Sequence, residues 1–142
     1  RATKETAMQN FEQIRGHVQS HFRITTNDPY VLCVELSLDA GKRHQSVFLA
    51  ELEDDDGRRL LRASTIIAPI TGIDARRMLA YNWHARVGWL AIGDLDGVPY
   101  LQLCENRPYG TLDGAELDRL VLEIGGQGDR MERLLSAGGD LL

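Results

Sequence analysis

The sequence predicts an α+β protein in which helices cover one side of a mainly antiparallel sheet. Apolar residues recur at helical spacing in residues 4–22, 71–83 and 113–135. Five shorter segments between them alternate, or run apolar, as strands do. The connections between consecutive strands are short, as expected for antiparallel neighbours. The expected order is α-β-β-β-α-β-β-α, with a five-stranded sheet.

The first element is an amphipathic helix over residues 4–22. Its apolar residues are spaced three and four apart, which places them on one face of a helix: Ala7, Phe11, Ile14, Val18 and Phe22. Pro29 ends the helix, because proline lacks an amide hydrogen and biases the residue before it towards extended geometry.

Three strands follow the first helix. Tyr30–Leu38 alternates, and its even-numbered residues form one apolar face. His44–Leu52 carries apolar residues in both registers, and Leu60–Ile67 ends before Pro69. Turn-forming residues, including an Asp56-Gly57 step, separate these strands and favour hairpins.

A second helix and a hairpin come next. Thr71 can cap the helix, Asp74 favours the positive end of its dipole, and the helix runs to about Trp83. The hairpin pairs Val87–Gly93 with Val98–Leu103 through an acidic turn that ends in Asp-Gly.

The last helix begins near Asp113, where a Glu three residues later is typical of a capping box. Gly125, Gly126 and Gly128 interrupt its apolar pattern. Each glycine costs a helix about 1 kcal/mol relative to alanine, so we expect a kink or two shorter helices here.

Composition limits the kind of protein. The 142 residues fit one domain, spanning residues 1–142. The net charge of −5 argues against nucleic acid or an anionic membrane as a partner. No apolar run approaches the about 20 residues of a membrane span. Two cysteines, Cys33 and Cys104, are too few for a disulfide scaffold, which favours reduced thiols and a cytoplasmic setting.

The motifs that could carry chemistry are incomplete. His17 and His21 have a spacing that suits one metal ion, but no third ligand is evident, so we interpret them as solvated or partly packed. Asp94 and Asp96 resemble the start of a calcium loop without its later ligands. The glycines at 125–128 lack the Lys-Ser/Thr of a phosphate-binding loop. We expect no catalytic residue, no metal and no cofactor, and therefore no enzyme.

The sequence also predicts no chemical role for the two cysteine thiols. Both cysteines lie in ordinary strand patterns, which indicates structural thiols. Cys33 shares a strand face with Glu35, so an accessible redox or nucleophilic thiol is the alternative there.

Four aromatic residues are concentrated around the hairpin: Tyr81, Trp83, Trp89 and Tyr100. Both strands of the hairpin also carry apolar residues in both registers. Aromatics are common in cores, but they also anchor interfaces, because they bury a large area with few rotatable bonds. The helices of a small domain cover one face of its sheet, so the other face needs a partner or a ligand. This surplus apolar surface indicates binding rather than catalysis.

These segments resemble the type III secretion chaperone fold, shared by CesT-like effector chaperones and the YbjN-like family. Nearly the whole chain matches in element order, and residues 71–135 match in pattern. The matching segments are the helix end Met78–Trp83, the strand, turn and strand at Gly88–Asp94, Asp96-Gly97 and Tyr100–Leu103, and the final helix at Leu112–Leu117 with Asp129–Leu135.

The resemblance implies a homodimer without catalysis that binds an extended segment of a secreted effector or another partner polypeptide. We assign self-association to Met78, Trp83 and Trp89. We expect the strand residues Val47, Phe48 and Leu49 to offer apolar surface to the partner.

Two alternatives remain open. One is a YbjN-like regulatory or interaction domain that serves no secretion system. The other is an enzyme or small-molecule binder that uses a groove on the sheet, which an enclosed pocket with convergent polar groups would indicate.

Overall fold

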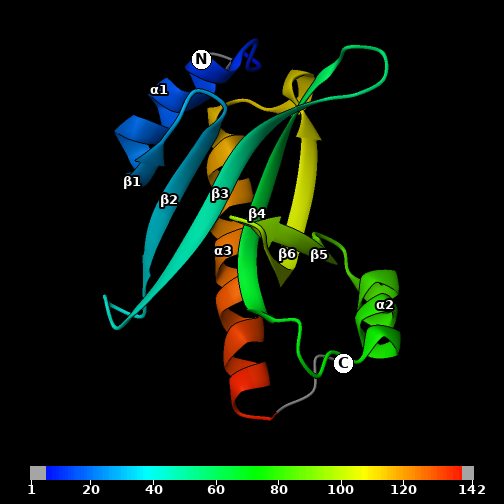
Figure 1. Cartoon of the computed structure of the whole chain (residues 1–142). Coiled ribbons are helices and arrows are strands. Elements are labelled where there is room, and N and C mark those ends of the chain that lie inside the picture. The colour runs from blue at the N-terminus through cyan, green and yellow to red at the C-terminus, as the bar shows by residue number, and fades with distance from the viewer. Residues whose placement is uncertain (1–5, 139–142) are drawn as a thin grey trace.

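The sheet has six antiparallel strands, one more than expected, and three α-helices accompany it (Figure 1). The computed structural model describes residues 6–138. The elements are α1 (Phe11–His21), β1 (Arg23–Asn27), β2 (Val31–Leu38), β3 (Arg43–Glu53), β4 (Arg59–Pro69), α2 (Ala75–His84), β5 (Trp89–Leu95), β6 (Val98–Pro108), the short 3-10 helix η1 (Tyr109–Thr111) and α3 (Gly114–Ser136). The α+β class and the antiparallel sheet are confirmed.

The additional strand is β1, which pairs with β2 from Arg23 opposite Glu35 to Asn27 opposite Leu32. Ile and Thr dominate this segment, and β-branched residues favour strands. The full strand order is β1-β2-β3-β4-β6-β5, so β4 pairs with β6 and leaves β5 at an edge.

The first helix is shorter than expected. Asn10 caps it by accepting a hydrogen bond from the Gln13 amide, and Phe22 is already extended. Residues 4 and 5 of the expected helix lie outside the described residues. Its apolar face is confirmed where the helix forms, because Phe11, Ile14 and Val18 are buried.

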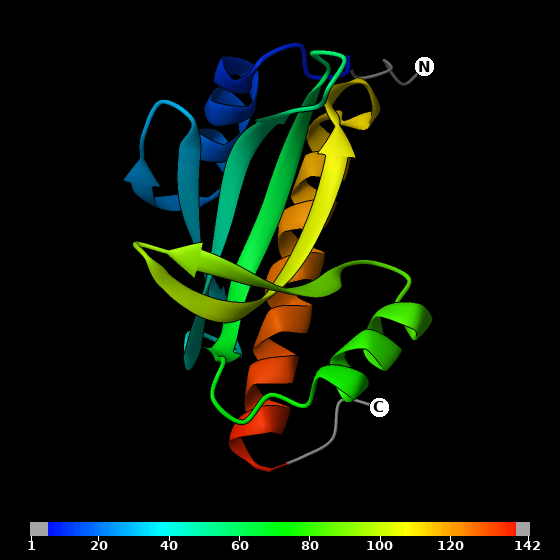
Figure 2. The same ribbon diagram turned by 45° about the vertical axis from the view of Figure 1, so that its right-hand side comes forward.

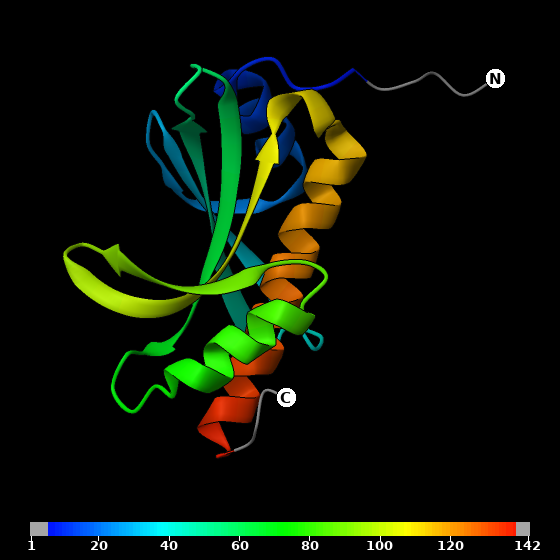
Figure 3. The ribbon, with the colours of Figure 1, turned by 90° about the vertical axis from the view of Figure 1, so that its right-hand side faces the viewer.

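The helices lie on one side of the sheet, as expected. Figures 1 and 2 show α3 running along one face of the sheet, with α1 at one end of the molecule and α2 at the other. Figure 3 shows the β5–β6 hairpin extending away from α3. None of the helices described between residues 6 and 138 is long and apolar enough to cross a bilayer.

The core lies between the sheet and the helices α1 and α3. Its fully buried side chains come from the helix-facing register of the strands and from the inner faces of both helices: Ile14, Val18, Leu32, Val34, Val47, Leu49, Leu61, Leu103, Leu117, Val121 and Ile124. The opposite register of the strands faces away from all three helices, and this helix-free side is called the open face below.

The helix α3 is continuous through its glycines, so the expected kink is wrong. Gly125 and Gly128 face the sheet, where a Cβ at Gly128 would stand 2.3 Å from Thr65 Cγ2. Thr65 is fixed in place, because its hydroxyl donates to the Ser46 carbonyl and accepts from the Gln45 amide. The glycines allow close packing instead of breaking the helix.

This packing predicts opposite effects for two glycine substitutions in α3. Gly128→Ala should lower the free energy of unfolding by about 1–3 kcal/mol, because the new methyl group overpacks against Thr65. Gly126→Ala should raise it by up to about 1 kcal/mol, because a Cβ there meets no described atom within 4 Å and alanine favours helix. Urea denaturation measures both, and equal effects of the two changes would contradict the packing argument.

Candidate partner-binding surfaces

The helix α2 and the edge strand β5 expose three large apolar side chains. Leu79 is 69% exposed, Trp83 is 83% exposed and Ile92 is 64% exposed. Leu79 and Trp83 are one helical turn apart on α2, and Leu79 and Ile92 both line a hollow of about 290 Å³ between helix and strand. These three residues are called the α2–β5 patch. Exposed apolar clusters of this kind mark interaction sites.

Hydrogen bonds attach α2 to β5 and α3, and Met78 and Tyr81 of this helix pack partly buried against the core. None of the residues Ala75–His84 is buried. The Asn82 side chain pairs with both backbone groups of Leu90, accepting from its N–H at 2.7 Å and donating to its C=O at 3.1 Å. Gln127 of α3 donates to the Tyr81 hydroxyl, and burial raises the pKa of Tyr81. Asn82 therefore acts on β5 as a neighbouring strand would.

The hairpin turn is as the sequence predicts, whereas the cap of α2 differs from the prediction. The Asp74 carboxylate, rather than Thr71, caps α2 by accepting from the amides of Arg76 and Arg77. The hairpin turn places Asp96 at φ 51° and Gly97 at φ 80°. Two positive φ values are those of a type I′ turn, which explains the Asp-Gly step.

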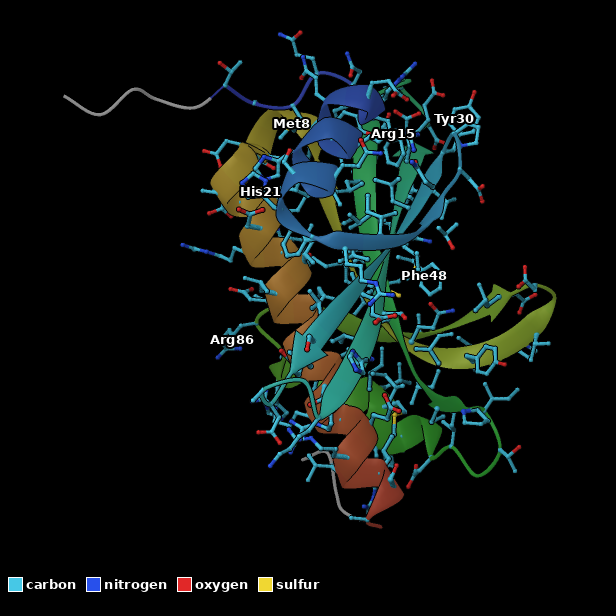
Figure 4. All side chains as sticks on the ribbon, turned by 90° about the vertical axis from the view of Figure 1, so that its left-hand side faces the viewer. Met8, Arg15, His21, Tyr30, Phe48 and Arg86 are labelled. Atoms are coloured by element: carbon cyan, nitrogen blue, oxygen red, sulfur yellow. The ribbon has the colours of Figure 1, made fainter. Side chains whose placement is uncertain are left out.

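The open face carries a second apolar surface. One row of paired residues crosses four strands, from Phe48 on β3 through Ser64 on β4 and Cys104 on β6 to Trp89 on β5. This set is called the open-face row. Its two aromatic residues stand about 14 Å apart, at three strand spacings, with small side chains between them. Figure 4 shows Phe48 projecting from the sheet on the side away from α3.

The structure separates the residues assigned to partner binding. Phe48 is half-buried on the open face, but Val47 and Leu49 are fully buried in the helix-facing core. As the chain is folded, only Phe48 of the three can be contacted by a partner. The expectation for Val47 and Leu49 is corrected, because alternation sends the neighbours of Phe48 to the opposite face.

The residues assigned to self-association are also divided. Met78 and Trp83 lie on α2, whereas Trp89 lies on the open face of β5. The sequence did not single out Leu79 and Ile92 as exposed apolar residues, although the four-residue spacing of Leu79 and Trp83 was visible in it. Trp83 was identified as an anchor because it is aromatic, and Leu79 shares its helix face.

The thiols are structural in this fold. Cys33 is 4% exposed and Cys104 is 7% exposed, and both are free. Burial raises the pKa of Cys104, which keeps the thiol protonated. The alternative of an accessible thiol at Cys33 is therefore wrong.

One further hollow, of about 530 Å³, lies between the β4–α2 loop, α2 and the end of α3. Its lining is largely apolar and includes Ile73, Met78 and Leu135. Its charged residues Asp74 and Arg77 pair with each other at 3.5 Å, and Asp74 also caps α2. Such an arrangement gives no convergent set of reactive groups.

Solved structures share this arrangement of elements. The HopA1–SchA chaperone–effector complex matches with a TM-score of 0.56 and 14% identity, over 83% of this chain and 88% of that chain. The type III secretion chaperone SycH of Yersinia pestis, in complex with a stable fragment of YscM2, matches with a TM-score of 0.53 and 16% identity, over 84% and 97%. The chain has the type III secretion chaperone fold.

The chaperone fold extends to YbjN, a putative transcription regulator from E. coli. That match has a TM-score of 0.59 and 13% identity, and it covers 96% of this chain and 100% of that chain. No family model matches the sequence, and no curated protein matches it significantly. The resemblance read from residues 71–135 is thus confirmed at the level of fold.

The hydrogen bonds between α2 and β5 predict that stability is sensitive to substitution of Asn82. Asn82→Ala should lower the free energy of unfolding by about 1–3 kcal/mol, because it leaves both backbone groups of Leu90 without their partner. His84→Ala, an exposed change on the same helix, is the matched control and should stay within about 0.5 kcal/mol. Equal stability of the two variants in urea denaturation would show that Asn82 does not hold α2.

Proposed function

We propose that this protein is a non-enzymatic cytoplasmic homodimer that binds an extended segment of a partner polypeptide, as a chaperone for a secreted effector. The observation that carries the proposal is the α2–β5 patch, where Trp83 is 83% exposed, the most of any large apolar residue described, and Leu79 and Ile92 are exposed on the same two elements. The shared fold supports the proposal, because two of the matched structures contain chaperones in complex with another polypeptide.

Self-association is assigned to α2, with Met78 and Trp83 as expected from the sequence and Leu79 and Ile92 added. A second copy brings the same patch, so a two-fold axis through this region would pair the apolar side chains of both subunits. Trp83 is the natural anchor, since exposed tryptophans dominate the energetics of many interfaces.

Partner binding is assigned to the open-face row. Phe48 and Trp89 are both partly exposed on this face and offer aromatic surface to an extended polypeptide, although Cys104 between them is itself buried. The carboxylates of the chain, with a net charge of −5, favour a partner segment that carries basic residues beside its apolar ones.

A YbjN-like regulatory or interaction domain is the second candidate. The likeness to YbjN supports it, because it covers 96% of this chain and 100% of that chain. An adjacent gene for a secreted effector or a secretion apparatus would favour the chaperone role, and its absence would favour the regulatory one.

The dimer assignment predicts that Trp83→Glu separates the subunits. Loss of a hot-spot aromatic weakens binding by about 2 kcal/mol or more, which is about 30-fold in Kd. Light scattering over a concentration series should give wild-type protein twice the mass of its 15.9 kDa chain, and the variant the mass of one chain. Leu122→Glu on α3, a similarly exposed apolar residue, is the control and should remain dimeric. A monomeric wild type, or a dimeric Trp83→Glu, would contradict the assignment.

The partner assignment predicts that Phe48→Glu loses the polypeptide. Wild-type protein recovered from its source cells should carry one dominant polypeptide, identified by mass spectrometry. With that polypeptide, Phe48→Glu should bind about tenfold more weakly or worse in calorimetry, while Leu122→Glu should bind normally. Binding of the polypeptide should slow hydrogen exchange of backbone amides in β3 and β5 relative to the free protein. Recovery of no partner across growth conditions, or unchanged binding by Phe48→Glu, would count against this role.

A further inference from the structure

Three potential metal ligands meet where α1 packs against α3. His17 and His21 are one turn apart on α1, with ring centroids 4.0 Å apart and planes inclined by 16°. Asp118 of α3 places its Oδ1 atom 2.8 Å from His17 Nε2. One nitrogen from each histidine and a carboxylate oxygen lie within 4.8 Å of one another. Figure 4 shows His21 at the end of α1, beside the first turns of α3.

The tautomer of His21 leaves the correct atom free for a metal. Its Nδ1 atom lies 2.8 Å from the carbonyl oxygen of His17. A carbonyl oxygen only accepts, so His21 Nδ1 donates a proton, and the lone pair of the neutral ring is on Nε2. Metal-binding histidines usually have this arrangement, because a backbone carbonyl that accepts from one ring nitrogen orients the other towards the ion.

We propose that His17, His21 and Asp118 bind one divalent transition-metal ion of the zinc class. Two imidazole nitrogens and one carboxylate oxygen form a donor set that zinc accepts in proteins, with water in the remaining position. Calcium and magnesium ions do not suit this site, because they prefer a larger number of ligands that are all oxygen atoms. The site is separate from the proposed self-association surface, because α1 and α2 lie at opposite ends of the molecule (Figure 1).

Only side-chain rotation is needed to form the site. Bonds of about 2.0–2.1 Å in a tetrahedron place ligand atoms about 3.3 Å apart, so no present separation must close by more than about 1.5 Å. His21 is exposed and can turn, whereas His17 and Asp118 are only 17% and 32% exposed and already touch. The metal ion replaces the proton shared between His17 and Asp118.

The bound ion would tie α1 to α3. Asp118 is 101 residues from His17 in the sequence, so the ion closes a long loop through the folded chain. A ligand that binds the folded state and not the unfolded state raises the free energy of unfolding by RT ln(1 + L/Kd), where L is the free ligand concentration, so the effect grows with the free concentration of the ion. The first helix and the edge strand β1 that follows it are then held to the body by more than the apolar face of α1.

The test is zinc titration of untagged full-length protein in a calorimeter, with the melting temperature measured in parallel. Wild type should bind one Zn²⁺ per chain, and saturation should raise Tm by about 5 °C or more. His21→Ala and Asp118→Asn should each weaken binding by on the order of tenfold or more. Both are expected to fold, since His21 is exposed and asparagine keeps an oxygen for His17.

Controls separate this site from unspecific binding. His84→Ala removes an exposed histidine of α2 and should bind zinc as wild type does. Co²⁺ should give the visible absorption of a nitrogen–oxygen site in wild type, and this absorption should be lost in His21→Ala. Absence of stoichiometric binding, or equal binding by wild type, His21→Ala and Asp118→Asn, would overturn the proposal. Neither result would affect the dimer or partner assignments, which Trp83→Glu and Phe48→Glu test.

Discussion

The close approach of α3 to the sheet is the contact on which the rest of the structure depends. A Cβ on Gly125 would stand 2.3 Å from Leu36 Cδ1, and one on Gly128 the same distance from Thr65 Cγ2, so the helix backbone is in contact with the strands. This contact closes one face of the sheet with side chains that have almost no exposure. No partner can bind to this face of the sheet without unfolding the core, so the sheet can offer only its open face and its edges to a partner.

The two remaining surfaces are maintained in different ways. The open face is a continuation of the sheet, and the strand ladder alone holds Phe48 and Trp89 in one row. The α2–β5 patch depends on a helix with no fully buried residue over Ala75–His84, which Asn82 joins to the edge of β5 and which Met78 and Tyr81 pack partly buried against the core. Trp83 is 83% exposed, so its side chain does not contribute the hydrophobic stabilisation that burial provides. A second subunit that covered Trp83 would add this stabilisation to the complex.

The sequence was a good guide where local rules decide the structure, and a poor one where distant contacts do. Alternation, caps and the Asp-Gly turn predicted most elements. The strand β1 was missed, because Arg23–Asn27 is short and carries one apolar residue, so its β-branched residues were too few to stand out before the pairing with β2 was known. The apolar residues of β3 in both registers could not show which register faces α3, so Val47 and Leu49 were assigned to the wrong side. The role of the glycines in α3, and the meeting of Asp118 with His17, require the tertiary structure.

The strand β5 connects the two surfaces, because successive residues of a strand point to opposite faces. Trp89 belongs to the open-face row, Leu90 packs inward and pairs with Asn82 through its backbone, and Ile92 joins the patch beside α2. A polypeptide that packs on Trp89 therefore contacts the strand that positions α2, and a second subunit that covers Ile92 contacts the strand that positions Trp89. The proposed self-association surface and the proposed partner-binding surface therefore share one edge strand. Any twist imposed on β5 at one surface must change the geometry of the other, since the strand has a single backbone.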